Sequence, residues 1–178
     1  MEGSFDRKKK LAIPYLEYFN VTIMDRKSKL NKIKVCQLTA VDFSVSKFLL
    51  PLIDGMNKKG WDVDIICSNG KYSKELEDQG YKFKFVKIER SYNIFKLIRS
   101  TYNVYKIFVK HRYDIVHVHS PIASIIGRIA SKLAGVPLIV YTAHGFYFHK
   151  EMNKIKYLFY FIIEKLLSYL TDLIFTQS

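Results

Sequence analysis

From Lys32 onward, apolar and polar positions follow two patterns that take turns along the chain. Short apolar or alternating runs predict strands, and apolar positions three and four residues apart predict helices. The predicted strands are 32–40, 61–68, 81–88, 113–120, 136–143 and 172–177. The predicted helices are 44–60, 91–112, 121–135 and 153–171, with a turn and a short helix at 69–80.

Glycine and proline mark several of these boundaries. Gly60 and Gly135 are expected to end helices, and Pro121 is expected to begin one. Pro51 must lie in the first turns of helix 44–60 or kink it, because proline has no backbone N–H to donate. Strand 81–88 alternates strictly, so one of its faces is expected to contact solvent.

Strands that are almost continuously apolar and alternate with helices indicate an α/β domain. Its sheet is expected to be mostly parallel, with helices on both faces. In such sheets ligands bind beyond the carboxyl ends of the strands, where the strand order reverses. Functional residues are therefore expected at 39–46, 68–71, 117–121 and 142–149.

The turn after the first strand carries hydroxyl groups, Asp42 and Lys47 beside a helix N-terminus. Such a terminus can hold an anion with its backbone N–H groups. The glycine patterns G-x-G-x-x-G and G-x-x-x-x-G-K-[ST] are absent from this turn, so a classical dinucleotide or P-loop site is not expected. The plain alternative is that Ser44 caps the helix, and both interpretations remain open.

Two histidines, His117 and His119, lie two residues apart on a predicted strand and therefore point to the same face. One of them could be a hydrogen-bonded core residue. A metal site would need further ligands at suitable spacing, and none is evident, so no metal is expected. His119 ends the strand and is the better site candidate, together with Ser120.

The stretch "YTAHGFYFH", residues 141–149, follows another buried strand. His144 comes just after the strand end, and Gly145 allows a tight turn that brings backbone close to a ligand. Alternatively, the aromatic residues 146–148 fill the core and His144 only satisfies a carbonyl. Position alone does not decide between the two.

Helix 91–112 carries a basic stripe and has no acidic residue. The stripe consists of Lys96, Arg99, Asn103, Lys106 and Lys110. The buried stripe is expected from Ile94, Ile98, Tyr105 and Phe108 with Leu97 and Val104. A solvated face is the usual interpretation of such a stripe, and contact with anionic lipid is the alternative.

The charge of the whole chain points the same way. Lys and Arg number 29 against 16 acids, which gives a net charge of +13 and favours anionic partners. Nucleic acid is not expected, because no recognised binding module accompanies the charge. With 178 residues and 49% hydrophobic content, the chain is long and apolar enough for one domain with a core.

The domain is expected to cover 33–178, preceded by a basic, partly disordered extension at 1–32 with a short helix at 13–20. No secretory signal peptide is recognised in the extension. Cys36 and Cys67 lie in apolar strands and are expected to be reduced core residues, which suits the cytosol. Charges interrupt the hydrophobic stretch 157–175, so it is not expected to span a membrane.

Residues 114–149, "DIVHVHSPIASIIGRIASKLAGVPLIVYTAHGFYFH", resemble the N-terminal Rossmann-like domain of glycosyltransferase family 4, which has the GT-B architecture. The similarity is closest to the bacterial branch that makes capsule, exopolysaccharide and lipid-linked oligosaccharides. Residues 41–68 and 171–178 are similar to other parts of the same domain.

This resemblance implies a retaining transfer of a sugar from a nucleotide-sugar to an acceptor hydroxyl, without an obligatory metal or cofactor. The histidine at the position of His144 would lie beside the transferred sugar and stabilise charge at the reacting carbon. The acceptor side would be lined by Asp42, Phe43, Ser44, His119, Ser120 and Gly145. A lipid-linked acceptor suits the basic stripe and a cytoplasmic, peripheral place on the inner face of the plasma membrane.

Two departures from the family accompany the resemblance. The glycine pair common after the first strand is replaced by "AVDFSVSKF", residues 40–48. The second domain with its paired-glutamate donor motif is also expected to be missing from the 178 residues, so no stand-alone transferase activity is expected. The alternatives are a Rossmann-like module that docks on anionic membrane or a partner chain and, with least support, a nicotinamide-dependent oxidoreductase.

Overall fold

The fold was analysed in a computed structural model, which describes residues 32–89, 92–144 and 151–176. The predicted extension lies, apart from Lys32, outside the described residues. The six described strands are β1 (Lys34–Val41), β2 (Asp62–Ser68), β3 (Lys82–Phe85), β4 (Ile115–His119), β5 (Leu138–Ala143) and β6 (Leu173–Thr176). They form one parallel sheet in the order β3-β2-β1-β4-β5-β6. The predicted Rossmann-like α/β architecture is confirmed.

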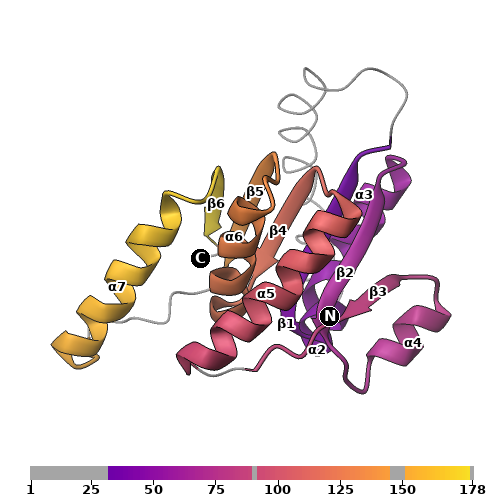
Figure 1. Cartoon of the computed structure of the whole chain (residues 1–178). Coiled ribbons are helices and arrows are strands. Elements are labelled where there is room, and N and C mark those ends of the chain that lie inside the picture. Colours follow the sequence, from indigo (N-terminus) through magenta and orange to yellow (C-terminus); the bar gives the residue numbers. More distant parts are fainter. Residues whose placement is uncertain (1–31, 90–91, 145–150, 177–178) are drawn as a thin grey trace.

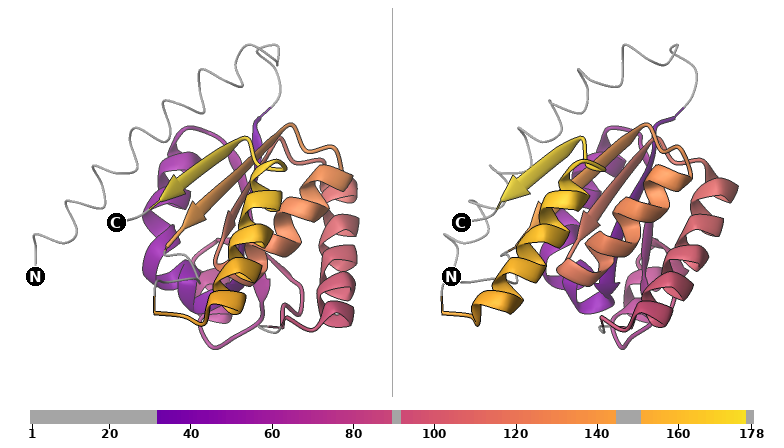
Figure 2. Two further views of the ribbon diagram at one scale, coloured as in Figure 1. Left: turned by 90° about the vertical axis from the view of Figure 1, so that its left-hand side faces the viewer. Right: turned by 60° about the vertical axis from the view of Figure 1, so that its left-hand side comes forward.

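Helices cover the two faces of this sheet (Figures 1 and 2). One face packs against a continuous helical segment made of α2 (Asp42–Ser44), the π-helical η1 (Val45–Leu49) and α3 (Leu50–Lys58), and against α4 (Ser73–Asp78). The other face carries α5 (Ile94–His111) and α6 (Pro121–Leu133). Helix α7 (Lys154–Ser168) lies beside α6 and precedes β6.

Strand residues alternate between two apolar cores. In β1, Cys36 and Leu38 pack into the core beneath α5 and α6, whereas Val35 packs into the core beneath α3. Gln37 points to the α3 side as well, because side chains alternate along a strand. Both cysteines are buried and free, as predicted.

The segment after β1 corrects one expectation. The helix begins at Asp42, with Val41 at the N-cap position and no side-chain cap, so Ser44 lies inside the helix and does not cap it. Pro51 is the second residue of α3 and directly follows the π-helical turns of η1. The π-helical turns therefore lie where proline, which has no N–H to donate, interrupts the regular α-helical pattern.

The third predicted strand is shorter than expected. β3 ends at Phe85, because its partner β2 ends at Ser68 and offers no further backbone. The chain instead bonds to the Ser68 side chain: the N–H of Ile88 donates to Ser68 Oγ at 2.9 Å. Val86 and Ile88 are nevertheless buried. The apolar pattern at 86–88 therefore indicated burial, not pairing in the sheet.

The predicted buried stripe of α5 is also partly wrong. Val104 and Phe108 are buried as expected, but Ile94 and Ile98 are about 60% exposed. From Ile94 to Arg99 only Leu97 is partly buried. The first turns of α5 therefore lack the cover that the rest of the helix receives from the sheet and α6.

Helix α7 is tied to α6 by a buried arginine. Arg128 is fully buried, its Nη2 lies 2.9 Å from an Oε2 oxygen of Glu164 on α7, and its guanidinium stacks 4.3 Å from the ring centre of Tyr141. The same Nη2 donates to Ser124 Oγ at 2.8 Å. A charge buried this deeply needs such partners, because an isolated one would be costly.

Candidate functional site

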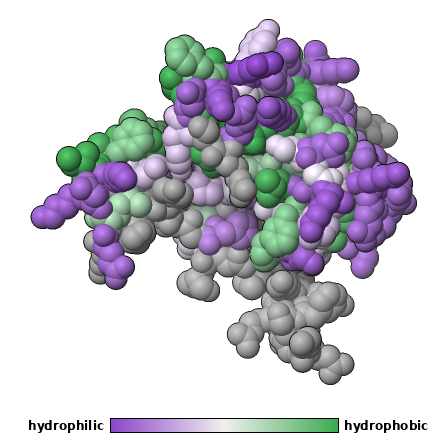
Figure 3. All heavy atoms as spheres, turned by 90° about the horizontal axis from the view of Figure 1, so that it is seen from below, coloured by the Kyte–Doolittle hydropathy of each residue, from purple (hydrophilic) through white to green (hydrophobic). Residues whose placement is uncertain are grey.

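The candidate site lies at the edge of the sheet where the strands end. β1 and β4 are neighbours in space although two strands separate them in sequence, so the strand order reverses between them. Ligands of open α/β sheets bind at this kind of switch point. His119 and Ser120 come from the end of β4, and His144 directly follows β5. Figure 3 looks onto this edge.

Three histidine rings meet there, on the α3 side of the sheet. The ring centres of His117 and His119 are 4.1 Å apart, and those of His119 and His144 are 5.8 Å apart. His117 Nε2 lies 2.8 Å from Thr142 Oγ1 on the neighbouring strand β5. His119 Nε2 lies 2.8 Å from Gln37 Oε1 on β1. Residues from three strands thus build one polar cluster.

Burial keeps the inner two rings neutral. His117 is fully buried, and this desolvation, helped by nearby His144, lowers its pKa to about 3. The pKa of His119 is held well below its usual value by desolvation first and then by His117 and His144. At neutral pH both rings therefore act as hydrogen-bonding groups without charge.

His144 differs from the other two because it is exposed. Its ring centre lies 6.0 Å from that of Phe48, which is 52% exposed on η1. Phe48 in turn contacts Phe43, with ring centres 6.5 Å apart. An exposed histidine bordered by exposed aromatic rings forms a rim on which a sugar ring could stack.

Asp42 makes structural hydrogen bonds at the same edge of the sheet. Its Oδ2 accepts hydrogen bonds from the N–H of Tyr72 at 2.7 Å and from the N–H and hydroxyl of Ser73 at 2.9 and 3.1 Å. These bonds hold the start of α4 against the end of β1. Gly70 is required next to it, because a Cβ there would lie 2.3 Å from Asp42 Oδ1. Ligand binding by Asp42 remains a prediction.

Ser120 has an unusual backbone for a residue with a side chain. Its φ is 66°, in the left-handed region, although it occupies the N-cap position of α6. Its side chain makes no capping hydrogen bond. Strain of this kind gathers at functional sites.

The remaining predicted residues lie elsewhere or outside the described part of the chain. Gly145 belongs to 145–150 and is not described. Partly buried Ser44 lies next to Phe43 in the helix after β1, whereas the basic stripe lies on α5, away from the histidines. Within the described ranges, no group of three or more His, Cys, Asp or Glu side chains is arranged to hold a metal ion.

Sequence reasoning missed Gln37, included Thr142 only within the range 142–149 without a role, and missed Phe48. The first two carried a usable signal, since a polar side chain within a continuously apolar strand must find a buried partner. Phe48 gave no such signal, because an aromatic residue in an amphipathic helix is more often a core residue.

Comparisons with known proteins agree with the fold and the expected family. Residues 34–178 match the family described as "Glycosyl transferase 4-like". The chain is 35% identical over 131 residues to an Escherichia coli protein named UDP-Gal:alpha-D-GlcNAc-diphosphoundecaprenol alpha-1,3-galactosyltransferase, covering 72% of this chain and 34% of that one. It is 30% identical over 146 residues to the putative glycosyltransferase EpsD of Bacillus subtilis, covering 80% and 37%.

The chain therefore spans about a third of the length of these relatives. Among solved structures, a putative UDP-N-acetylglucosamine 2-epimerase from Listeria monocytogenes superposes with a TM-score of 0.62 at 17% identity, over 82% of this chain and 39% of that one. This likeness concerns the fold and corresponds to one half of a GT-B structure. The match over 34–178 shows that the chain belongs to the glycosyl transferase 4-like family.

Proposed function

We propose that the chain is the acceptor-binding half of a retaining glycosyltransferase. It would act in cell-surface glycan synthesis, where a sugar passes from a nucleotide-sugar to a lipid-linked or polysaccharide acceptor. The nucleotide would be held mainly by the second half of such an enzyme. The isolated 178-residue chain is therefore expected not to transfer sugar from a nucleotide-sugar. The observation that carries the proposal is exposed His144 beside neutral His119 at the strand-order switch.

In this proposal His144 hydrogen-bonds the transferred sugar and stabilises the charge that develops at its reacting carbon. His119 and Ser120 bind the acceptor, with residues 42–44 and Gly145 around them. The Escherichia coli relative is named for a diphosphoundecaprenol-linked N-acetylglucosamine, which supports a lipid-linked acceptor as the first candidate.

The test has a binding arm and a turnover arm. The 178-residue chain is titrated with N-acetylglucosamine linked through diphosphate to a farnesyl chain, and saturable binding is expected. Ser120→Ala should weaken acceptor binding, whereas His111→Ala, at the far end of α5, should not. In a full-length relative with the matching histidine, alanine should lower kcat by about 10²–10³-fold. Unchanged acceptor binding in Ser120→Ala would refute the acceptor site, and unchanged turnover in the histidine-to-alanine relative would refute the role of His144.

A second candidate function, docking on an anionic membrane, is favoured by the surface of α5. Exposed Phe95 and Tyr102 lie beside the basic stripe, with 79% and 58% of their surface accessible. An interfacial helix combines cationic and aromatic side chains in this way. Lys96 of the stripe forms an ion pair with Glu89 from the preceding segment, and its contact with a membrane remains a prediction.

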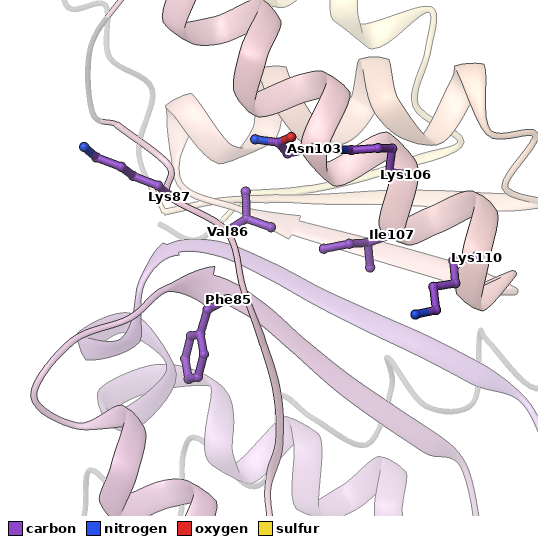
Figure 4. A pocket seen from close by; sticks show the side chains of 7 residues that line it. All are labelled: Phe85, Val86, Lys87, Asn103, Lys106, Ile107 and Lys110. Atoms are coloured by element: carbon purple, nitrogen blue, oxygen red, sulfur yellow. The ribbon is translucent and has the colours of Figure 1, made fainter.

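Lys106 and Lys110 of the stripe border a hollow of about 340 Å³ between α5 and the segment after β3. Figure 4 shows Lys106 extending toward Asn103, with Lys110 one turn further along α5 and Lys87 on the opposite wall. The hollow has no acidic residue in its lining. Phosphate-bearing headgroups are the surface groups that such a lining attracts.

Apolar surface continues on the other side of α5. A groove of about 440 Å³ runs between α5 and α6 and is lined by apolar side chains that include Ile98, Tyr102 and Ile129. Exposed hydrophobic residues also cover α7, seen at the left of Figure 3: Ile155, Leu158, Phe159, Phe161, Ile162 and Leu166. No helix within the described ranges is long and apolar enough to cross a bilayer. Contact with one leaflet would cover this surface.

Vesicle sedimentation tests this candidate. Binding to vesicles with 30% phosphatidylglycerol should exceed binding to pure phosphatidylcholine and should fall with salt. The variant Arg99→Gln/Lys106→Gln/Lys110→Gln should lose about 100-fold in affinity, at about 1 kcal/mol per charge. Lys58→Gln/Lys59→Gln/Lys74→Gln removes the same charge from the opposite side of the sheet and should bind nearly as the parent. An equal loss of vesicle affinity in both triple variants would reject α5 as the membrane-binding surface. Binding that does not depend on the charge of the lipid would reject it as well.

A further inference from the structure

Gln37 is a fully buried polar residue in the middle of β1 and connects two side chains. Its Nε2 lies 3.3 Å from Met56 Sδ, and its Oε1 lies 2.8 Å from His119 Nε2. A thioether sulfur accepts hydrogen bonds and cannot donate them. The amide NH₂ therefore faces the sulfur, and the amide oxygen faces the histidine.

This orientation fixes the tautomer of His119. Because Gln37 Oε1 only accepts, His119 Nε2 must carry the proton and donate it. The ring is neutral, since burial lowers its pKa well below the usual value. Its Nδ1 atom is therefore a bare acceptor that requires a donor.

The described residues supply no such donor. His119 Nδ1, Thr39 Oγ1 and Ser120 Oγ are all buried atoms without a hydrogen-bond partner among them. β1 and β4 are paired at Leu38 and Val118, so Thr39 and His119 follow side by side where the strands end. Ser120 comes next, half-buried and with its strained φ of 66°. Buried polar atoms are rarely left unpaired in proteins, and a group of them signals a missing partner.

We propose that Thr39, His119 and Ser120 form a subsite for a sugar hydroxyl, with Gln37 as a positioning residue that fixes the His119 tautomer. A hydroxyl can donate to Nδ1 and accept from the two side-chain hydroxyls at once. An ionised phosphate cannot donate to Nδ1, so the subsite selects the sugar ring over the diphosphate of an acceptor. This inference rests on the proposed function, because it assigns part of the acceptor to named atoms.

The tautomer is tested first, on the 178-residue chain labelled with ¹⁵N-histidine. Two-bond ¹H–¹⁵N spectra should show His119 protonated at Nε2 only. Gln37→Leu should give a mixture of tautomers, and Gln37→Glu, which keeps an acceptor in place, should retain the proton at Nε2. A proton at Nδ1 in the parent chain, or an unchanged tautomer in Gln37→Leu, would overturn the positioning role.

Ligand class is tested by titrating the same chain with N-acetylglucosamine and, separately, with inorganic phosphate. The sugar should shift the His119 signals saturably, and phosphate should not. Thr39→Val and Ser120→Ala should each weaken sugar binding about tenfold, and Thr39→Ser should restore it. Ser131→Ala is the matched control, because it removes a buried hydroxyl further along α6 that also has no hydrogen-bond partner among the described residues.

Equal binding of sugar and phosphate, or sugar binding indifferent to Thr39→Val and Ser120→Ala, would overturn the subsite. Thermal melting of each variant separates such results from misfolding, and Thr39→Ser provides a folded comparison. Turnover is not measured in these experiments. The subsite can therefore fail while His144 proves catalytic, or hold while His144→Ala leaves the full-length enzyme active.

Discussion

Two buried polar clusters lie on opposite faces of the same sheet, and they are built differently. On the α6 side, the guanidinium of Arg128 is bound by Ser124, Glu164 and the ring of Tyr141. On the α3 side, His117 and His119 have lost their charge, and His119 Nδ1 has no partner in the described part of the chain.

The difference distinguishes a structural cluster from the candidate functional site. Arg128 joins α6 to α7 across 36 residues of sequence and leaves only its Nη1 without a partner among the described atoms. The histidine cluster ends at the open edge of the sheet, where unmet hydrogen bonds can be completed by a ligand. A buried cluster that is mostly satisfied holds elements together, and one left incomplete at a switch point is suited to binding.

Acid should distinguish the two clusters most strongly. The unfolded chain takes up protons on both histidines as the pH falls below 6.5, whereas folded His117 does so only near pH 3. The free energy of unfolding should therefore fall with pH by about 1.4 kcal/mol per pH unit for each histidine. Urea unfolding at pH 7 and pH 5 measures this loss, which is expected to reach several kcal/mol.

The variant His117→Asn controls that measurement, because asparagine can bond Thr142 and does not titrate. It should remove about half of the pH dependence between pH 7 and pH 5. A free energy of unfolding that stays flat over this interval would mean that the histidines are not buried neutral.

Glu164→Ala should have the next largest effect, on stability alone. It leaves the guanidinium of Arg128 buried without its carboxylate, which costs about 3 kcal/mol. Glu151→Ala removes an exposed carboxylate as the matched control and should change the free energy of unfolding by less than about 0.5 kcal/mol. The tautomer spectrum of His119 should not change in either variant. A loss of the His119 signature in Glu164→Ala would show that the two clusters are coupled.

Thr142→Val should have the smallest effect. It removes the hydroxyl 2.8 Å from His117 Nε2 and leaves a buried ring nitrogen unsatisfied, which costs about 1–2 kcal/mol. Thr142→Ser keeps the hydroxyl and should recover most of this loss in the same urea titration. Equal stability of the valine and serine variants would mean that the bond contributes nothing.

The sequence by itself determined the order of the elements, the parallel sheet and the edge at which the site lies. These follow from local patterns, because apolar periodicity records which side of each segment is buried. It also pointed to His119 and His144, since both directly end or follow buried strands. At 86–88 the apolar pattern could mean a strand or a buried loop, and at Ile94 and Ile98 it could mean a buried or an exposed face. Neighbouring elements decided both cases.

Only the tertiary structure decided which polar groups meet. Gln37 and His119 are 82 residues apart, and Asp42 and Ser73 are 31 apart, so no local pattern could pair them. Glu89 likewise reaches Lys96 from outside the helix in which the basic stripe was recognised. The physical reason is that side chains pair across neighbouring strands, and the spatial order of the strands differs from their order in the chain. Burial can be encoded locally, whereas the identity of a partner depends on how the sheet is assembled.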